Sequence, residues 1–97
     1  MQFKLNMDAN LNGTSYQGFV RLTHSDIVAA FGQGDDCCDK TTQEWVFESD
    51  TGEVFSLYDW KEQTTPQHEY EWHIGAEEHR NVDRFKNWLL ETIRKAA

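Results

Sequence analysis

The segment at residues 44–60, EWVFESDTGEVFSLYDW, limits the possible folds more than any other part of the chain. Two strand-like runs flank Asp50-Thr51-Gly52, in which the glycine can supply the positive φ of a turn. We therefore predict a hairpin of two strands, Glu44–Glu48 and Val54–Trp60.

Alternation along this hairpin assigns side chains to faces. Phe55 and Leu57 point to one side of the second strand, and Tyr58 and Trp60 point to the other with Val54 and Ser56. Apolar residues on both sides indicate either a strand that is covered on both faces of the sheet or an aromatic patch that is open to solvent.

Three further strands are predicted from shorter signals. Phe3, Leu5 and Met7 alternate with polar residues in the first dozen positions, and Ser15–Leu22 reads as a strand broken at Gly18. A last strand follows from the alternation of three apolar residues with acids and a histidine, namely Tyr70, Trp72 and Ile74.

Two segments have the signals of helices. Thr23 can cap a helix with Asp26 three residues on, and Gly32 is a natural end. The second helix is expected from about Glu77 to Ala96, since one stripe of it is apolar and Trp88 lies at the edge of that stripe. The stripe consists of Val82, Phe85, Leu89 and Ile93.

The predicted order is ββαβββα, which is typical of an α+β fold in which two helices cover one face of an antiparallel sheet. A length of 97 residues fits a single domain, residues 1–97, and an aromatic content of 13% supplies rings for a modest core. No apolar run approaches the roughly 20 residues that span a membrane, and the N-terminus lacks the pattern of a secretory signal. The adjacent Cys37 and Cys38 suit reduced thiols, so we expect a cytoplasmic protein.

The net charge of −8 is unevenly distributed. Residues 35–79 hold thirteen acidic and two basic residues, a net of −11, whereas residues 80–97 have a net of +3. An acidic block of this kind repels nucleic acid and attracts basic surfaces, although solubility alone also explains it. We therefore expect no direct binding to nucleic acid.

The segment EYEWHIGAEEH at residues 69–79 is rich in metal-binding residue types. If Trp72 and Ile74 face the core, Glu69, Glu71 and His73 face solvent. The spacing of the histidines, His68, His73 and His79, does not place two imidazoles on one face of a regular element, as a zinc helix requires. We therefore predict no metal site.

Patterns of catalytic residues are also missing. The chain has neither a phosphate-binding glycine loop nor a nucleophile elbow. A thiol–imidazole pair between Cys37 or Cys38 and His24 or His73 stays open, because the sequence cannot place these side chains together. No catalytic residue and no cofactor is predicted.

The chain resembles a small family of phage-encoded proteins over about residues 13–75. The matching segments are GTSYQGFV, DIVAAFG, KTTQEWVFESDTGEVFSLYDWK and EWHIG. Gln33 stands where the family has a proline, and Ala76 where it has a second glycine, which puts the geometry of these loops in doubt. The resemblance implies a phage source rather than one activity, and small acidic phage proteins are often anti-CRISPR or anti-restriction inhibitors.

Three functional hypotheses follow. The first is a phage-encoded inhibitor that contacts a basic surface of a host defence or nucleic-acid-binding protein, in one version as a nucleic-acid mimic, and that is a monomer or homodimer. The second is a small metal- or Cys/His-dependent enzyme, and the third is an assembly module that self-associates through an aromatic sheet face. For the first, the predicted partner-binding residues are Asp35, Asp36, Tyr58, Trp60, Lys61, Glu69, Glu71, Trp72 and His73.

Overall fold

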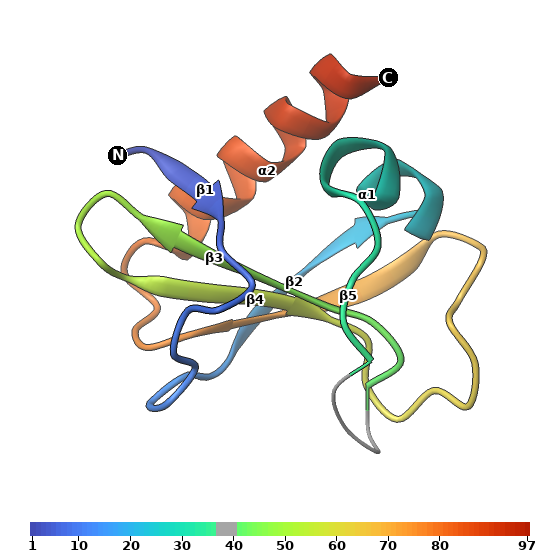
Figure 1. The fold of residues 1–97 in the computed structure, drawn as a ribbon, viewed down its shortest axis with the longest axis horizontal. Helices are drawn as coiled ribbons and strands as arrows, with labels where there is room; N and C mark the ends of the chain where they lie inside the picture. Colours follow the sequence, from blue (N-terminus) through green and yellow to red (C-terminus); the bar gives the residue numbers. More distant parts are fainter. Residues whose placement is uncertain (37–40) are drawn as a thin grey trace.

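The structure is a computed structural model that describes residues 1–36 and 41–97. Its elements follow the predicted order ββαβββα, so the predicted α+β fold is confirmed (Figure 1). The predicted state of Cys37 and Cys38 concerns residues that lie outside the described part. The elements are β1 (Phe3–Leu5), β2 (Ser15–Leu22), α1 (His24–Phe31), β3 (Glu44–Ser49), β4 (Val54–Tyr58), β5 (Tyr70–Ala76) and α2 (Val82–Ala96).

The five strands form one sheet in the order β1-β3-β4-β5-β2, and every neighbouring pair is antiparallel. Figure 1 shows α1 and α2 on the same side of this sheet. The other side carries no helix among the residues that the structure describes. An antiparallel sheet tolerates this arrangement, because alternate side chains of each strand point to opposite faces.

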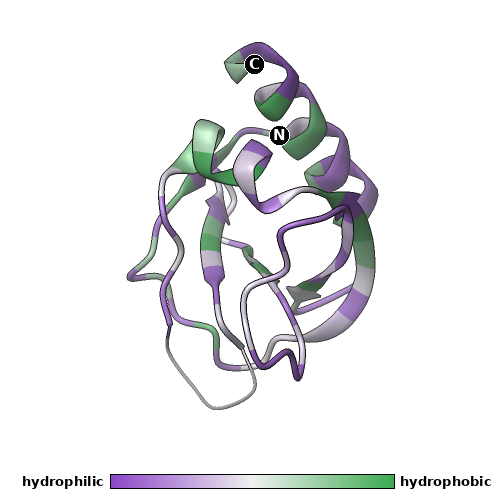
Figure 2. Cartoon of the chain, turned by 90° about the vertical axis from the view of Figure 1, so that its right-hand side faces the viewer, coloured by the Kyte–Doolittle hydropathy of each residue, from purple (hydrophilic) through white to green (hydrophobic). Residues whose placement is uncertain are grey.

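The core fills the space between the sheet and the helices. Trp45, Trp72 and Phe55 are fully buried there, and the ring of Phe85 in α2 stacks on Phe55 at a centroid distance of 4.8 Å. The apolar stripe of α2 is buried as predicted, and Figure 2 shows apolar and polar segments alternating along this helix.

The signals at both ends of α1 are confirmed. The hydroxyl of Thr23 accepts a hydrogen bond from the backbone N–H of Asp26 at 3.3 Å. At the other end Gly32 has a φ of +82°, and its N–H donates to the carbonyl of Val28 at 2.8 Å.

Two strands end earlier than predicted, and a third has an internal irregularity. β1 ends at Leu5 and β4 at Tyr58, so Trp60 lies in the connection after the strand. The predicted break at Gly18 is an irregularity of register between Tyr16 and Gly18 within a continuous β2.

A glycine at position 75 suits a turn by residue type, but Gly75 pairs with Ser56 of β4 and Tyr16 of β2 in the middle of the sheet. The last helix begins at Val82 and not at Glu77.

Among the described residues, neither helix has the length and apolar composition needed to cross a membrane.

Candidate partner-binding face

The sheet face opposite the helices, here called the open face, carries a row of side chains that crosses all the strands from β3 to β2. The register pairs Glu44 with Tyr58, Tyr58 with His73, and His73 with Phe19. An isolated antiparallel bridge adds Asp35 next to Glu44. Directly paired residues point to the same side of a sheet, so this row places two acids beside three rings.

Four rings on this face form a cluster around His73, here called the aromatic cluster: Tyr16, Tyr58, Trp60 and His73. The imidazole of His73 lies edge-on to Tyr16 at a centroid distance of 4.7 Å and to Tyr58 at 5.5 Å. It lies nearly parallel to Trp60, at 6.3 Å. These four residues line an open hollow of about 390 Å³.

Small residues next to the cluster make room for it. Gly75 lies between Ser56 and Tyr16 in the neighbouring row, and a Cβ at Gly75 would be 2.5 Å from the Ser56 hydroxyl and 3.4 Å from the Tyr58 ring. Distances under 3 Å are not found for real Cβ atoms. A side chain at Gly75 would therefore collide with the Ser56 hydroxyl, whereas the Tyr58 ring would be in ordinary contact with it.

Trp60 is placed by the connection that follows β4. Its backbone N–H donates to the Tyr70 hydroxyl at 3.1 Å, and that hydroxyl donates to Glu62 at 3.3 Å. The ammonium of Lys61 lies 5.8 Å from the centroid of the Trp60 ring. Lys61 has a φ of +58°, a left-handed conformation that is costly for a residue with a side chain.

Asp59, between Tyr58 and Trp60, is fully buried and fixes the start of β3. Its carboxylate accepts hydrogen bonds from the Thr42 N–H at 2.7 Å, the Gln43 N–H at 3.2 Å and the Thr42 hydroxyl. The Thr42 hydroxyl also lies 2.7 Å from that of Thr65. One carboxylate thus ties together the chain before β3 and the chain after β4.

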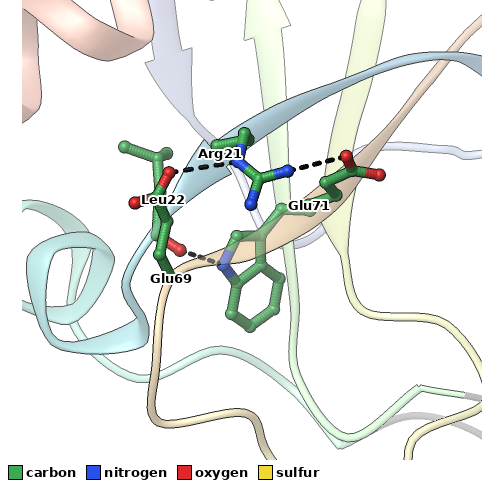
Figure 3. Close-up of polar contacts among 5 residues, drawn as sticks. Arg21, Leu22, Glu69 and Glu71 are labelled. Carbon is green, nitrogen blue, oxygen red and sulfur yellow. Dashed lines mark hydrogen bonds and ion pairs between the residues drawn. The ribbon is translucent and has the colours of Figure 1, made fainter.

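An ion-pair group lies beside the aromatic cluster, on β2, on β5 and at the residue just before β5. The Arg21 guanidinium bonds Glu71 at 2.8 Å and Glu69 at 3.1 Å (Figure 3). All three side chains are more than half exposed. Because one cation serves two carboxylates, the group keeps a net charge of −1.

Burial shifts the pKa values of two members of the cluster. Burial lowers the pKa of His73, against the opposite influence of Glu71 and Asp59. Burial raises the pKa of Tyr58, and the neighbouring Glu44 and Tyr16 raise it further. At neutral pH the cluster therefore presents a neutral imidazole and a neutral phenol.

The structure brings most of the predicted partner-binding residues to this face. Tyr58, Trp60 and His73 form the cluster with Lys61 beside it, and Glu69 and Glu71 flank it. Asp35 ends the row, and the exposed Asp36 follows it in the chain. His73 was predicted to be exposed between two acids, but it is half-buried because its neighbours are rings.

The prediction that Trp72 belongs to the partner-binding residues is wrong. Trp72 was predicted as a surface anchor, but its side chain is 0% exposed and its indole N–H donates to the Leu22 carbonyl at 3.0 Å. A side chain in the core cannot contact a partner. The alternation that places His73 on the open face places Trp72 on the covered one.

Sequence reasoning missed Tyr16 and Phe19, which are 53% and 42% exposed. Alternation could have predicted the exposure of Phe19. Val20 and Leu22 are buried on one face of β2, so Phe19 points to the other face. No such signal marked Tyr16, since the register shift at residue 17 changes the alternation before Gly18.

The histidines of residues 69–79 have different surroundings. Among residues 1–36 and 41–97, no three His, Cys, Asp or Glu side chains come together as a metal site would require. His73 is in the cluster, whereas His79 precedes α2 and its Nδ1 lies 3.1 Å from the Gln17 carbonyl.

A comparison of the chain with protein-family models finds no match, and a comparison with curated proteins finds none. The functional argument therefore depends on the open face itself.

Proposed function

We propose that this chain is a small binding protein that inhibits a host defence or nucleic-acid-binding protein by covering a basic surface of it. The observation that carries the proposal is the aromatic cluster, which lies on a sheet face without a covering helix in the described residues and is flanked by carboxylates on both sides. Tyrosine and tryptophan at the centre of a contact, with polar residues at its rim, are typical of binding hot spots.

The charge of the flanks selects the kind of partner. Asp35 and Glu44 lie at one end of the row, and Glu69 and Glu71 lie near the other. With a net charge of −8, the protein would be drawn to a basic surface and repelled by phosphate. In the narrower form of the proposal, these carboxylates take the places of phosphates in a nucleic-acid groove. The proposed location is the cytoplasm of the host.

Self-association is the second candidate, and the exposed rings of Tyr16, Phe19 and Trp60 favour it. The charges oppose it, because two copies meeting through this face would bring the same carboxylates together. The mass of the protein in solution, measured over a range of concentrations, decides between a monomer and a dimer.

The test is a pull-down from bacterial lysates with tagged wild type and two variants, at low and at moderate salt. Tyr16→Ala/Trp60→Ala alters the open face, and Leu90→Ala removes a similarly exposed side chain from α2 as a matched control. We expect a host protein that wild type and Leu90→Ala retain, that the double variant loses, and that moderate salt releases.

A partner retained equally by the double variant would contradict the proposal, as would the lack of any specific partner in lysates from several hosts. The denaturation midpoints of the variants, measured in parallel, separate a loss of contact from a loss of fold.

A further inference from the structure

We propose that the aromatic cluster is a receptor for an arginine side chain of the partner, whose guanidinium lies on the rings of the hollow and bonds a carboxylate at its rim. This inference rests on the proposed function and specifies its chemistry. It requires rings with accessible faces, a surrounding negative charge and space for the side chain.

The rings satisfy the first requirement. Trp60 is 39% exposed and Tyr16 is 53% exposed, and both line the hollow with Tyr58. The faces of such rings are negative and attract a cation within about 6 Å of the centroid. The His73 imidazole at the centre is neutral at neutral pH, since burial lowers its pKa, so it does not repel an incoming cation.

A cation, the ammonium of Lys61, already lies over the Trp60 ring. This ammonium lies 5.8 Å from the centre of the indole, although the backbone of Lys61 adopts a left-handed φ of +58°. An incoming guanidinium would compete with this intramolecular ammonium for the same ring. Removing the charge of Lys61 should therefore strengthen the binding of a cation, whereas removing the ring of Trp60 should weaken it.

The carboxylates distinguish arginine from a purely apolar side chain. Glu69 and Glu71 share the single cation of Arg21, which leaves one uncompensated negative charge next to the cluster. Glu44 is paired with Tyr58 on the opposite side and its charge acts on that phenol. A guanidinium is planar, stacks on rings and bonds carboxylates in a bidentate manner, which a lysine ammonium cannot do.

The hollow satisfies the third requirement. Its volume of about 390 Å³ lies in the usual range of small-ligand sites, and it is open on one side, as the side chain of another protein requires. A Cβ at the neighbouring Gly75 would lie 3.4 Å from the Tyr58 ring that lines the hollow.

The experiment is a titration of the protein with the blocked tripeptide acetyl-Gly-Arg-Gly-amide, followed by the NMR signals of the aromatic side chains. The control peptide has citrulline in place of arginine, which keeps the shape and removes the charge. We expect saturable shifts of the Trp60, Tyr16, Tyr58 and His73 signals with the arginine peptide and little response to citrulline.

Two variants of opposite expected effect sharpen the test. Trp60→Leu should weaken binding of the arginine peptide by about 2- to 30-fold, which corresponds to the usual strength of a cation on an indole. Lys61→Gln should tighten binding at low salt, because a competing charge is removed. Leu90→Ala on α2 should leave the affinity unchanged.

Equal binding of the citrulline peptide would overturn the inference, and so would an unchanged affinity of Trp60→Leu, no gain from Lys61→Gln, or shifts confined to other residues. The two proposals fail separately. If the lysate partner depends on the open face but the arginine peptide does not bind, only the arginine receptor is rejected. If the peptide binds but the partner ignores the open face, the proposed inhibitor is rejected.

Discussion

The two faces of this sheet use the same residue types for different purposes. On the covered face Trp45, Trp72 and Phe47 are fully buried against the helices. On the open face Tyr16 and Trp60 keep about half and two-fifths of their surfaces exposed, at 53% and 39%. Aromatic composition therefore does not distinguish a core from a binding surface, and the position of each ring relative to the pleat does.

Neighbours along one strand show this most directly. In β5, Trp72 is enclosed by the core while the adjacent His73 lies among open-face rings. In β4, Leu57 is fully buried, whereas Tyr58 lines the hollow. A single step along the chain moves a side chain from a stabilising role to a candidate binding role.

The largest expected effect comes from removing one indole from each face. Trp72→Ala should lower the free energy of unfolding by about 3–5 kcal/mol, because it leaves a large cavity in the core. Trp60→Ala should lower it by less than about 1 kcal/mol. Chemical denaturation followed by circular dichroism measures both, and comparable losses for the two variants would show that the faces do not differ as described.

The next largest effect is expected at Asp59, which is fully buried between the open-face residues Tyr58 and Trp60 in the chain. Asp59→Ala should lower the free energy of unfolding by about 2–3 kcal/mol, because the N–H groups of Thr42 and Gln43 lose their acceptor. Asp59→Asn keeps an acceptor oxygen and should cost less. Urea unfolding measures the pair, and an alanine variant no less stable than the asparagine variant would argue against this role.

Much of the fold was predictable because the signals were local. The turn at Gly52, the cap at Thr23 and the apolar stripe of α2 each depend on a few neighbouring residues, and all are confirmed. The position of Glu69 and Glu71 on the outside also followed from alternation, and both are exposed.

The candidate site was only partly predictable because it depends on register between distant strands. Tyr16 joins His73 through a pairing irregularity that no local pattern marks. Gly75 resembles a turn residue in sequence. The need for a residue without a side chain at this position becomes visible only in the sheet, where Ser56 is paired with it. Asp59 had a signal that was overlooked, since alternation with Tyr58 places its carboxylate toward the interior.

Gly75→Ala should have a smaller effect, because it adds one methyl group that collides with the Ser56 hydroxyl. We expect a loss of about 1–2 kcal/mol in the free energy of unfolding. The added Cβ meets the Ser56 hydroxyl at 2.5 Å, so the loss should shrink in a Ser56→Ala background. Thermal denaturation of the four proteins measures this coupling, and an equal cost in both backgrounds would place the crowding elsewhere.

The smallest expected effect is a pH dependence of stability that arises from His73 on the open face. Burial lowers the pKa of His73 below its ordinary value of 6.5, while Glu71 and Asp59 act in the opposite direction. The rings of Tyr16 and Tyr58 lie edge-on to the imidazole. The unfolded chain therefore binds a proton at this histidine more readily than the folded chain does. Stability from this group is complete above pH 6.5 and decreases as the pH falls through the folded pKa.

His73→Gln removes this titration and keeps a polar side chain of similar length. The difference in free energy of unfolding between wild type and His73→Gln should be constant from pH 8 to about pH 7. As the pH falls further, wild type should lose more stability than the variant does. Urea unfolding at a series of pH values measures it, and subtracting the variant removes the titration of the carboxylates. A difference that shifts in favour of wild type at low pH would mean that the rings and acids stabilise the imidazolium, and the open face would then hold a cation of its own.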